Sequence, residues 1–217
     1  MSETAPTGLL QIAALVSGQG RGSNLGALLD ACASGQIAGR IAVVIGTRSD
    51  SPALERARAG GAAVTVLSPR KYEEDEAGYA EALLRILRRH RIGLICLTGY
   101  MRKLPPAVVS AYAERIMNIH PALLPLFGGK GMFGEHVHRA VLESGMKVSG
   151  CTVHFVDEHY DSGPIIVQQA VPVHDADTPA TLAARILPEE HRAYALAVQL
   201  FASGRLRIEG RRVRVQE

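Results

Sequence analysis

Short apolar runs alternate with segments of helical periodicity along most of this 217-residue chain. A strand, a helix and a second parallel strand form a right-handed crossover unit. The repeated order therefore predicts a Rossmann-like α/β fold, with a largely parallel sheet and helices on both faces. We expect strands at residues 9–18, 41–47, 62–68, 94–100, 115–120, 149–158 and 164–173, and helices at 23–35, 51–61, 71–93, 105–113, 136–145 and 178–204, the last interrupted at Pro188.

The chain length and composition suit one α/β domain over residues 1–217. Hydrophobic residues make up 47% of the sequence and charged residues 21%, which is enough for a sizeable core. Residues 1–8 are expected to be a disordered N-terminal tail. Residues 205–217 alternate apolar residues with arginine, so we expect a C-terminal hairpin there.

Charge and cysteine usage exclude several classes of partner. The formal net charge is only +3, which argues against a nucleic-acid partner. No apolar run reaches membrane-spanning length, and the first residues lack the pattern of a signal peptide. Three cysteines without CxxC spacing suggest neither a disulfide framework nor a zinc knuckle. We therefore expect a cytoplasmic protein with small-molecule substrates and no membrane partner.

The first candidate site is the glycine-rich stretch S-G-Q-G-R-G-S-N, which follows the first expected strand and opens a helix. Small residues there let backbone N–H groups approach an anion at the positive end of the helix. Ser23 or Asn24 is expected to cap that helix. A dinucleotide fingerprint is incomplete because its last position is Ser23, and the Lys-Ser/Thr pair of a nucleotide P-loop is missing. Phosphate binding is predicted, and a plain tight turn is the alternative.

The second candidate site is N-I-H-P, at the end of the fifth expected strand. Asn118 and His120 lie two residues apart on a strand, so their side chains point to the same side. Pro121 restricts His120 to an extended conformation. An amide can donate to a developing oxyanion, and an imidazole can do the same or carry a proton. The pair predicts acyl transfer without a covalent intermediate. The alternative is two strand-end side chains bonded to nearby backbone.

A third polar element is Asp161, within Y-D-S-G-P. Aspartate before Ser-Gly-Pro is typical of a turn. Its functional interpretation is a carboxylate that raises the pKa of His120 and fixes its tautomer, although the sequence does not place the two together. His136 and His138 form an HxH pair, but without a nearby third ligand no metal site is predicted.

Several further motifs occur in order along the chain: S-G-x-G-x-G-S-N-L, L-T-G-Y-M-R, N-I-H-P-A-L-L-P, H-V-H-R-A-V-L, G-C-T-V-H-F-V and D-S-G-P-I-I. As a set they closely resemble the phosphoribosylglycinamide formyltransferases, which are folate-dependent members of the formyltransferase-like family. The resemblance runs from about Leu10 to the C-terminus. It implies the formyltransferase fold and transfer of a formyl group from the co-substrate 10-formyltetrahydrofolate to the amine of glycinamide ribonucleotide, in de novo purine (IMP) biosynthesis and without a metal.

The resemblance also implies roles for individual residues. Asn118, His120 and Asp161 are similar to the family's catalytic trio. A cradle for the ribonucleotide phosphate is implied at Gly22, Ser23 and Asn24, and Glu190 is implied to lie near the glycinamide substrate. The residues implied to contact folate are Met101, Arg102, Lys103, Leu104, Asn118, Val156, Asp157 and Tyr160.

The sequence departs from the family pattern in places. The glycine loop is longer by about two residues, and the loop after L-L-P by about five. Glu76 stands where the family often has an arginine near the folate glutamate tail, a contact that Arg70 or Lys71 could replace.

Rival functions share parts of the same pattern. A 10-formyltetrahydrofolate deformylase uses the same chemistry with water as acceptor, but usually carries an extra N-terminal domain. A methionyl-tRNA formyltransferase would need a further C-terminal domain. A non-catalytic nucleotide-binding module would leave the trio unexplained. The oligomeric state, monomer or homodimer, stays open.

Overall fold

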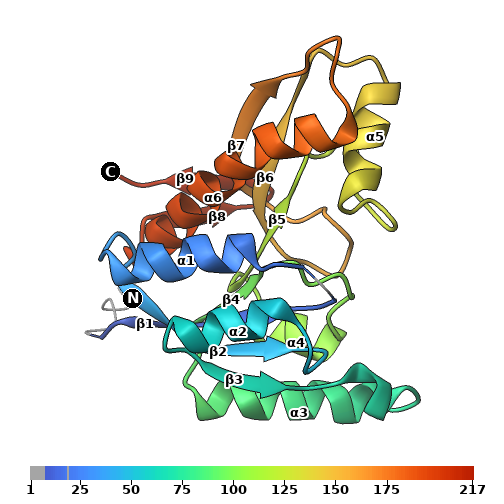
Figure 1. The fold of residues 1–217 in the computed structure, drawn as a ribbon. Coiled ribbons are helices and arrows are strands. Elements are labelled where there is room, and N and C mark those ends of the chain that lie inside the picture. The colour runs from blue at the N-terminus through green and yellow to red at the C-terminus, as the bar shows by residue number, and fades with distance from the viewer. Residues whose placement is uncertain (1–7, 19) are drawn as a thin grey trace.

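A computed structural model describes residues 8–18 and 20–217, so the expected tail lies outside the described residues except for Gly8. In the described residues, nine strands form one sheet in the order β3-β2-β1-β4-β5-β6-β7-β9-β8 (Figure 1). The strands are β1 Leu10–Val16, β2 Gly39–Gly46, β3 Ala63–Val66, β4 Leu94–Leu97, β5 Ile116–His120, β6 Val148–Phe155, β7 Ile165–Pro172, β8 Leu206–Glu209 and β9 Arg212–Val215.

The sheet has a parallel half and a mainly antiparallel half. Strands β3, β2, β1, β4 and β5 run parallel, as the alternation of strands and helices predicted. Beyond β5 the pattern changes, because β6 is antiparallel to β5 and β7 is antiparallel to β6. The connection from β6 to β7 is a short loop, which can join antiparallel neighbours but is too short for a crossover. The predicted C-terminal hairpin is confirmed as β8 and β9.

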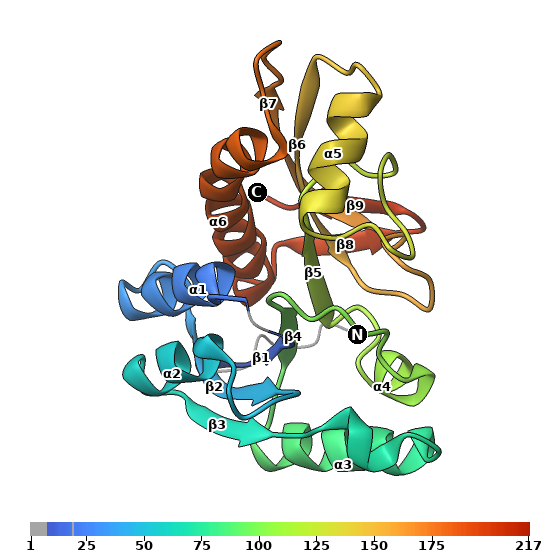
Figure 2. The same cartoon turned by 45° about the vertical axis from the view of Figure 1, so that its right-hand side comes forward.

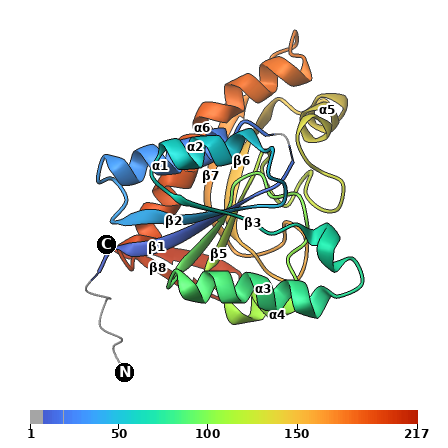
Figure 3. The same ribbon diagram turned by 60° about the horizontal axis from the view of Figure 1, so that its bottom comes forward.

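Helices cover both faces of the sheet, as expected for this class. Helices α1, α2 and α6 lie on one face and α3 and α4 on the other (Figure 3). Helix α6 packs along α1, β6 and β7, and α5 packs against α6 (Figure 2). The helices are α1 Ser23–Ala33, α2 Pro52–Ala59, α3 Glu76–Arg89, α4 Pro106–Ala111, α5 Glu135–Glu143 and α6 Pro179–Ala202, with a 3₁₀ turn, η1, at Pro69–Tyr72.

Strand β1 contributes side chains to a hydrophobic core on each face of the sheet. Its residues from Ile12 to Val16 are buried, and alternate side chains point to opposite faces. Ala14 and Val16 belong to the core under α1, α2 and α6. Ala13 and Leu15 belong to the core under α3 and α4. Burial on both faces explains why the strand reads as a continuous apolar run.

Two helix predictions were wrong in detail. The helix expected from residue 71 begins at Glu76, because the Asp75 side chain caps it by accepting a hydrogen bond of 2.8 Å from the Gly78 N–H. The interruption expected at Pro188 does not occur, and α6 continues through it. Buried packing on either side, at Ile186 and Tyr194, outweighs the hydrogen bond that proline cannot donate. Within the described part of the chain, no helix is both long enough and apolar enough to cross a membrane.

The cap predicted at Ser23 or Asn24 is also wrong. Gly22 is the N-cap of α1, with φ +67° and ψ +39°, and no side chain makes a capping bond. A Cβ atom at Gly22 would lie 2.8 Å from the Cβ of Ala53, so both the backbone conformation and the approach of α2 require glycine. Because Ser23 and Asn24 do not cap the helix, their side chains are available for other contacts.

Gly22→Ala should therefore lower the free energy of unfolding by about 2 kcal/mol or more. The left-handed conformation costs roughly 1–2 kcal/mol for a residue with a Cβ, and the overlap with Ala53 adds to it. Urea denaturation measures the loss. Gly18→Ala is the matched control, because Gly18 has φ +73° but open space around the Cβ position. Equal losses in the two variants would show that the Ala53 contact contributes nothing.

Candidate active site

A cavity of about 650 Å³ lies beyond the carboxyl ends of β4 and β5. This is the edge of a parallel sheet where ligands are expected to bind. Its walls come from the residues after β4, the end of β5, the loop before α5, the loop between β6 and β7, and one side of α6. The lining residues are 24, 97, 99–104, 109, 118–121, 129–134, 138, 154, 156–157, 159–161, 183–184, 187 and 190.

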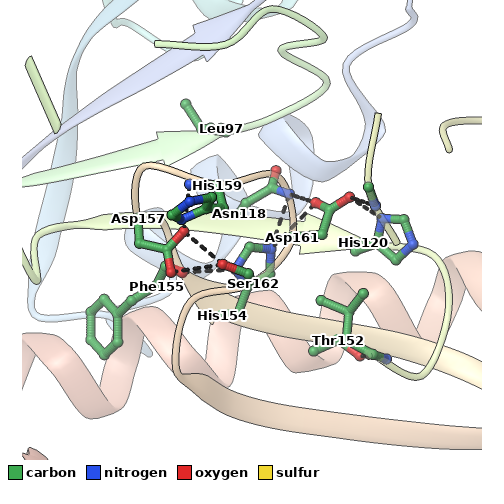
Figure 4. Close-up of polar contacts among 12 residues, drawn as sticks. Leu97, Asn118, His120, Thr152, His154, Phe155, Asp157, His159, Asp161 and Ser162 are labelled. Atoms are coloured by element: carbon green, nitrogen blue, oxygen red, sulfur yellow. Dashed lines mark hydrogen bonds and ion pairs between the residues drawn. The ribbon is translucent and has the colours of Figure 1, made fainter. Parts of the chain in front are cut away.

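The three predicted catalytic side chains meet at this cavity. Asn118 and His120 project from β5, and Asp161 reaches them from the loop between β6 and β7. The Asp161 carboxylate lies 3.5 Å from Asn118 Nδ2 through Oδ1 and 3.6 Å from His120 Nδ1 through Oδ2. Figure 4 shows Asp161 between the amide and the imidazole. The sequence could not place Asp161, and the structure brings it to both partners.

The His120 ring faces an acceptor at each nitrogen. Its Nε2–H donates to the carbonyl oxygen of Phe127 at 2.8 Å. The neutral ring then has no hydrogen on Nδ1, which faces the Asp161 carboxylate. Protonation at Nδ1 would let each ring nitrogen donate to an acceptor, Nε2 to the Phe127 carbonyl and Nδ1 to the Asp161 carboxylate. The Phe127 carbonyl therefore fixes the tautomer, a role predicted for Asp161, and the two contacts together favour the imidazolium.

Asp161 acts on the pKa of His120 in the predicted direction, but the net shift of that pKa is downward. The His120 side chain is only 4% exposed. This burial lowers the pKa of His120 below its ordinary value, and His154 adds to the effect, although Asp161 and the Phe127 carbonyl oppose it. Burial alone would raise the pKa of Asp161. Contacts with His154, the Gly129 N–H and His120 instead hold this pKa below its usual value. The resting site therefore holds a carboxylate beside an imidazole that protonates less readily than in water.

His154 is a site residue that the sequence reasoning missed. In the antiparallel pairing of β5 with β6, His154 lies opposite Asn118. Its Nε2 lies 3.3 Å from Asn118 Nδ2 and 3.7 Å from Asp161 Oδ1, and its Nδ1–H donates to the carbonyl of Phe155 at 2.7 Å. Nε2 therefore lies within reach of both the Asn118 amide and the Asp161 carboxylate. The available signal was the alternation of polar residues in C-T-V-H-F, which matches that of N-I-H.

Thr152 holds the chain that follows His120. It lies opposite His120 in the same pairing and is buried. Its hydroxyl donates to the Ala122 carbonyl at 2.6 Å and accepts from the Leu124 N–H at 3.0 Å. The Gln168 amide donates to the Leu124 carbonyl at 2.9 Å. Two strands thereby fix the path of residues 122–124 at the cavity wall.

At the predicted phosphate cradle, Asn24 lines the cavity, whereas Gly22 and Ser23 do not. Asn24 Nδ2 donates to Glu190 Oε2 at 2.8 Å, and Asn24 Oδ1 is buried without a hydrogen-bond partner. Burial raises the pKa of the Glu190 carboxyl, and the bond from Asn24 opposes that rise. The structure thus joins two separately predicted residues, from α1 and α6, into one polar pair at the cavity.

The residues predicted to contact folate all line the same cavity. The Met101 N–H donates to Ser17 Oγ at 2.8 Å, which ties this segment to the end of β1. Met101 and Tyr160 each expose a large apolar side chain, at 55% and 42%. Asp157 is engaged in its own loop, accepting from the His159 N–H and from Ser162 (Figure 4). The folate roles stay predictions, and neither Glu76 nor the η1 residues Arg70 and Lys71 line the cavity.

The HxH pair does not act as a unit. His138 is buried and lines the cavity, with its Nδ1 unpartnered, whereas His136 is exposed and contacts the edge of the Phe133 ring. Among residues 8–18 and 20–217, no group of three or more His, Cys, Asp and Glu side chains is arranged to hold a metal ion. That no metal is needed stays a prediction.

An open α/β sheet with an amide, an imidazole and a carboxylate around one cavity is an arrangement that suits an acyl-transfer enzyme. Comparison with known proteins gives the family. The chain belongs to the formyl transferase family, whose profile matches residues 10–198.

Two known proteins and one solved structure are similar to this chain over most of its length. The chain is 41% identical over 197 residues to phosphoribosylglycinamide formyltransferase, chloroplastic, of Arabidopsis thaliana, covering 91% of this chain and 67% of that protein. It is 40% identical over 199 residues to phosphoribosylglycinamide formyltransferase of Escherichia coli K12, covering 92% and 90%. The structure is similar to glycinamide ribonucleotide transformylase 1 from Symbiobacterium toebii, with a TM-score of 0.89 and 48% identity, covering 96% and 95%.

Replacing Asp161 by asparagine should lower the pKa of His120 further. The carboxylate favours the protonated imidazole, so its removal moves the loss of the proton to lower pH. NMR titration of the His120 ring, assigned with His120→Gln, measures the shift. Asp157→Asn is the control, because Asp157 lies in the same loop and bonds to His159 and Ser162. An unchanged titration in Asp161→Asn would show that the two groups are not coupled.

Proposed function

We propose that this protein is a phosphoribosylglycinamide formyltransferase, which transfers the formyl group of 10-formyltetrahydrofolate to the amine of glycinamide ribonucleotide in de novo purine (IMP) biosynthesis. The observation that carries the proposal is the Asn118–His120–Asp161 constellation in a cavity that also holds the Asn24–Glu190 pair. The names of the similar enzymes from Escherichia coli and Symbiobacterium toebii support the same substrates.

The cavity offers each substrate a chemically suitable wall. Met101 and Tyr160 present apolar surface for the aromatic part of folate, and the backbone of residues 101–104 can bond to its pterin edge. On the other side, Asn24 lines the cavity as the second residue of α1, a helix whose N-terminal N–H groups and dipole favour a phosphate. Glu190 supplies a carboxyl group for the amine of the ribonucleotide. Binding both substrates in one cavity makes the transfer step effectively unimolecular.

The chemistry follows from the trio. The amine of the ribonucleotide attacks the formyl carbon, which forms a C–N bond and turns the formyl oxygen into an oxyanion. Asn118 Nδ2 donates to that oxygen. His120 is neutral at rest. Its Nδ1 takes the proton that the amine loses, and the resulting imidazolium is paired with Asp161 and the Phe127 carbonyl. The bond to folate N10 then breaks, and N10 takes the proton from His120. Tetrahydrofolate and the N-formyl product leave.

We further propose that the enzyme needs no metal, acts on small molecules without a nucleic-acid or membrane partner, and works in the cytoplasm as a monomer or homodimer. The thiols of Cys32, Cys96 and Cys151 are free, which suits a reducing compartment. A single folding domain over residues 1–217 is part of this proposal. The continuous sheet supports it.

Loss of the formyl group from 10-formyltetrahydrofolate should depend on glycinamide ribonucleotide. Without an amine acceptor the trio has only water to activate, and the Asn24–Glu190 pair has no substrate group to bind. The test follows folate absorbance with and without the ribonucleotide. Equal turnover in both reactions would assign the protein as a deformylase, and no turnover in either would favour a non-catalytic binding module.

Asn24→Ala should raise the KM for the ribonucleotide by about tenfold and leave the KM for folate within about twofold. The change removes the donor to buried Glu190 and a polar group beside the phosphate end of α1. Steady-state rates with each substrate varied give both constants. Ser34→Ala, at the opposite end of the same helix, is the control. A larger effect on folate would assign this wall to the other substrate.

A further inference from the structure

The Asp161 carboxylate lies in a thin wall between two cavities. A second cavity, of about 460 Å³, lies behind the active site and shares Gly129, Tyr160 and Asp161 with it. The far side of this cavity is lined by Leu124, Pro125, Gly128, Ser162, Gly163, Ile165 and Arg211. Hydrogen bonds within the wall help to position the carboxylate.

One of those bonds comes from the backbone of residues 127–129. The Gly129 N–H donates to Asp161 Oδ2 at 2.9 Å. Two residues earlier, the Phe127 carbonyl accepts from His120 Nε2 at 2.8 Å. One short segment thus touches both the imidazole and the carboxylate, and it does so with main-chain atoms. The bond from Gly129 also favours the ionised form of Asp161.

Each glycine in this segment is required for a different physical reason. A Cβ atom at Gly128 would lie 2.6 Å from Leu124 Cδ2 and 3.1 Å from Asp161 Cβ, so a larger residue would require Leu124, Asp161 or the segment itself to shift. Gly129 has open space around its Cβ position, but its φ is +104°, which residues with a Cβ rarely adopt. The first glycine permits close approach, and the second aims the N–H at the carboxylate.

The start of the segment is anchored independently of Asp161. Thr152 and Gln168 bond to the backbone at Ala122 and Leu124. A change at Gly128 should therefore move residues 127–129 and leave the chain directly after β5 in place. The effect of a substitution at Gly128 can therefore be attributed to the contacts of Phe127 with His120 and of Gly129 with Asp161.

We propose that residues 127–129 form a backbone clamp that positions the His120 ring and the Asp161 carboxylate relative to each other. The clamp lies in the lengthened loop after L-L-P, and its role in catalysis rests on the proposed function. Phe127, Gly128 and Gly129 are positioning residues, because they act on the reacting groups through His120 and Asp161.

The test is Gly128→Ala, with Gly93→Ala as the matched control. A Cβ at Gly93 would lie 2.8 Å from a leucine methyl, Leu10 Cδ1, at the opposite end of β4 from the cavity. We expect Gly128→Ala to lower kcat for formyl transfer by about tenfold or more, with both KM values within about twofold. The control should keep its kcat. An unchanged kcat in Gly128→Ala, or an equal loss in the control, would overturn the clamp.

A double-mutant cycle separates positioning from general loosening. If the clamp acts through Asp161, Gly128→Ala should cost several-fold less in the Asp161→Asn background than in the wild type. Costs that simply add would contradict the proposal. If Gly128→Ala does not fold, Gly129→Ala replaces it, because its Cβ meets no neighbour and only φ is changed. Its control is Gly145→Ala, which has φ +74° and open space at the end of α5.

Failure of the clamp can be distinguished from failure of the proposed function. A wild-type protein that transfers no formyl group would refute the function. The clamp would then be tested by NMR titration of His120 in wild type and variant, with the other titratable groups that face it, Asp161, His154 and His138, unaltered. A titration curve that does not change between wild type and Gly128→Ala would refute the clamp.

Discussion

The antiparallel pairing of β5 with β6 is the constraint on which the candidate site depends. It sets Asn118 opposite His154 and His120 opposite Thr152. The first pair places the amide beside an imidazole, and the second holds the chain that leaves His120. A slip of one residue would turn these side chains to the other face of the sheet. The change from parallel to antiparallel strands at β5 is therefore the feature that builds the site.

The electrostatics of the site result from two opposing effects. Burial disfavours charge on both His120 and Asp161, whereas their mutual contact favours it. For the carboxylate, hydrogen bonds from neighbouring donors prevail, and its pKa falls. For the imidazole, burial prevails, and its pKa also falls. A neutral base beside an ionised acid suits a reaction in which a proton is taken up from an attacking amine and given back within one catalytic cycle.

The sequence predicted those parts of the site that depend on local geometry. Asn118 and His120 share a side because residues two apart on a strand always do. Local patterns could not place Asp161, because the loop between β6 and β7 carries it to β5 through tertiary structure. His154 required knowledge of which strand pairs with β5. The sign of the pKa shift at His120 required its burial, and the start of α3 at Glu76 depended on which of several acidic residues caps the helix.

The segment after Leu124 has a consequence for how its importance can be measured. Both of its contacts to the trio are made by main-chain atoms, a carbonyl at residue 127 and an N–H at residue 129. Alanine scanning removes side chains and leaves those atoms in place, so truncating Phe127 would not remove its backbone contact to His120. The sequence determines the shape of this wall through Gly128 and Gly129, which have no side chain to remove. In this segment the sensitive experiment is the addition of a methyl group, not its removal.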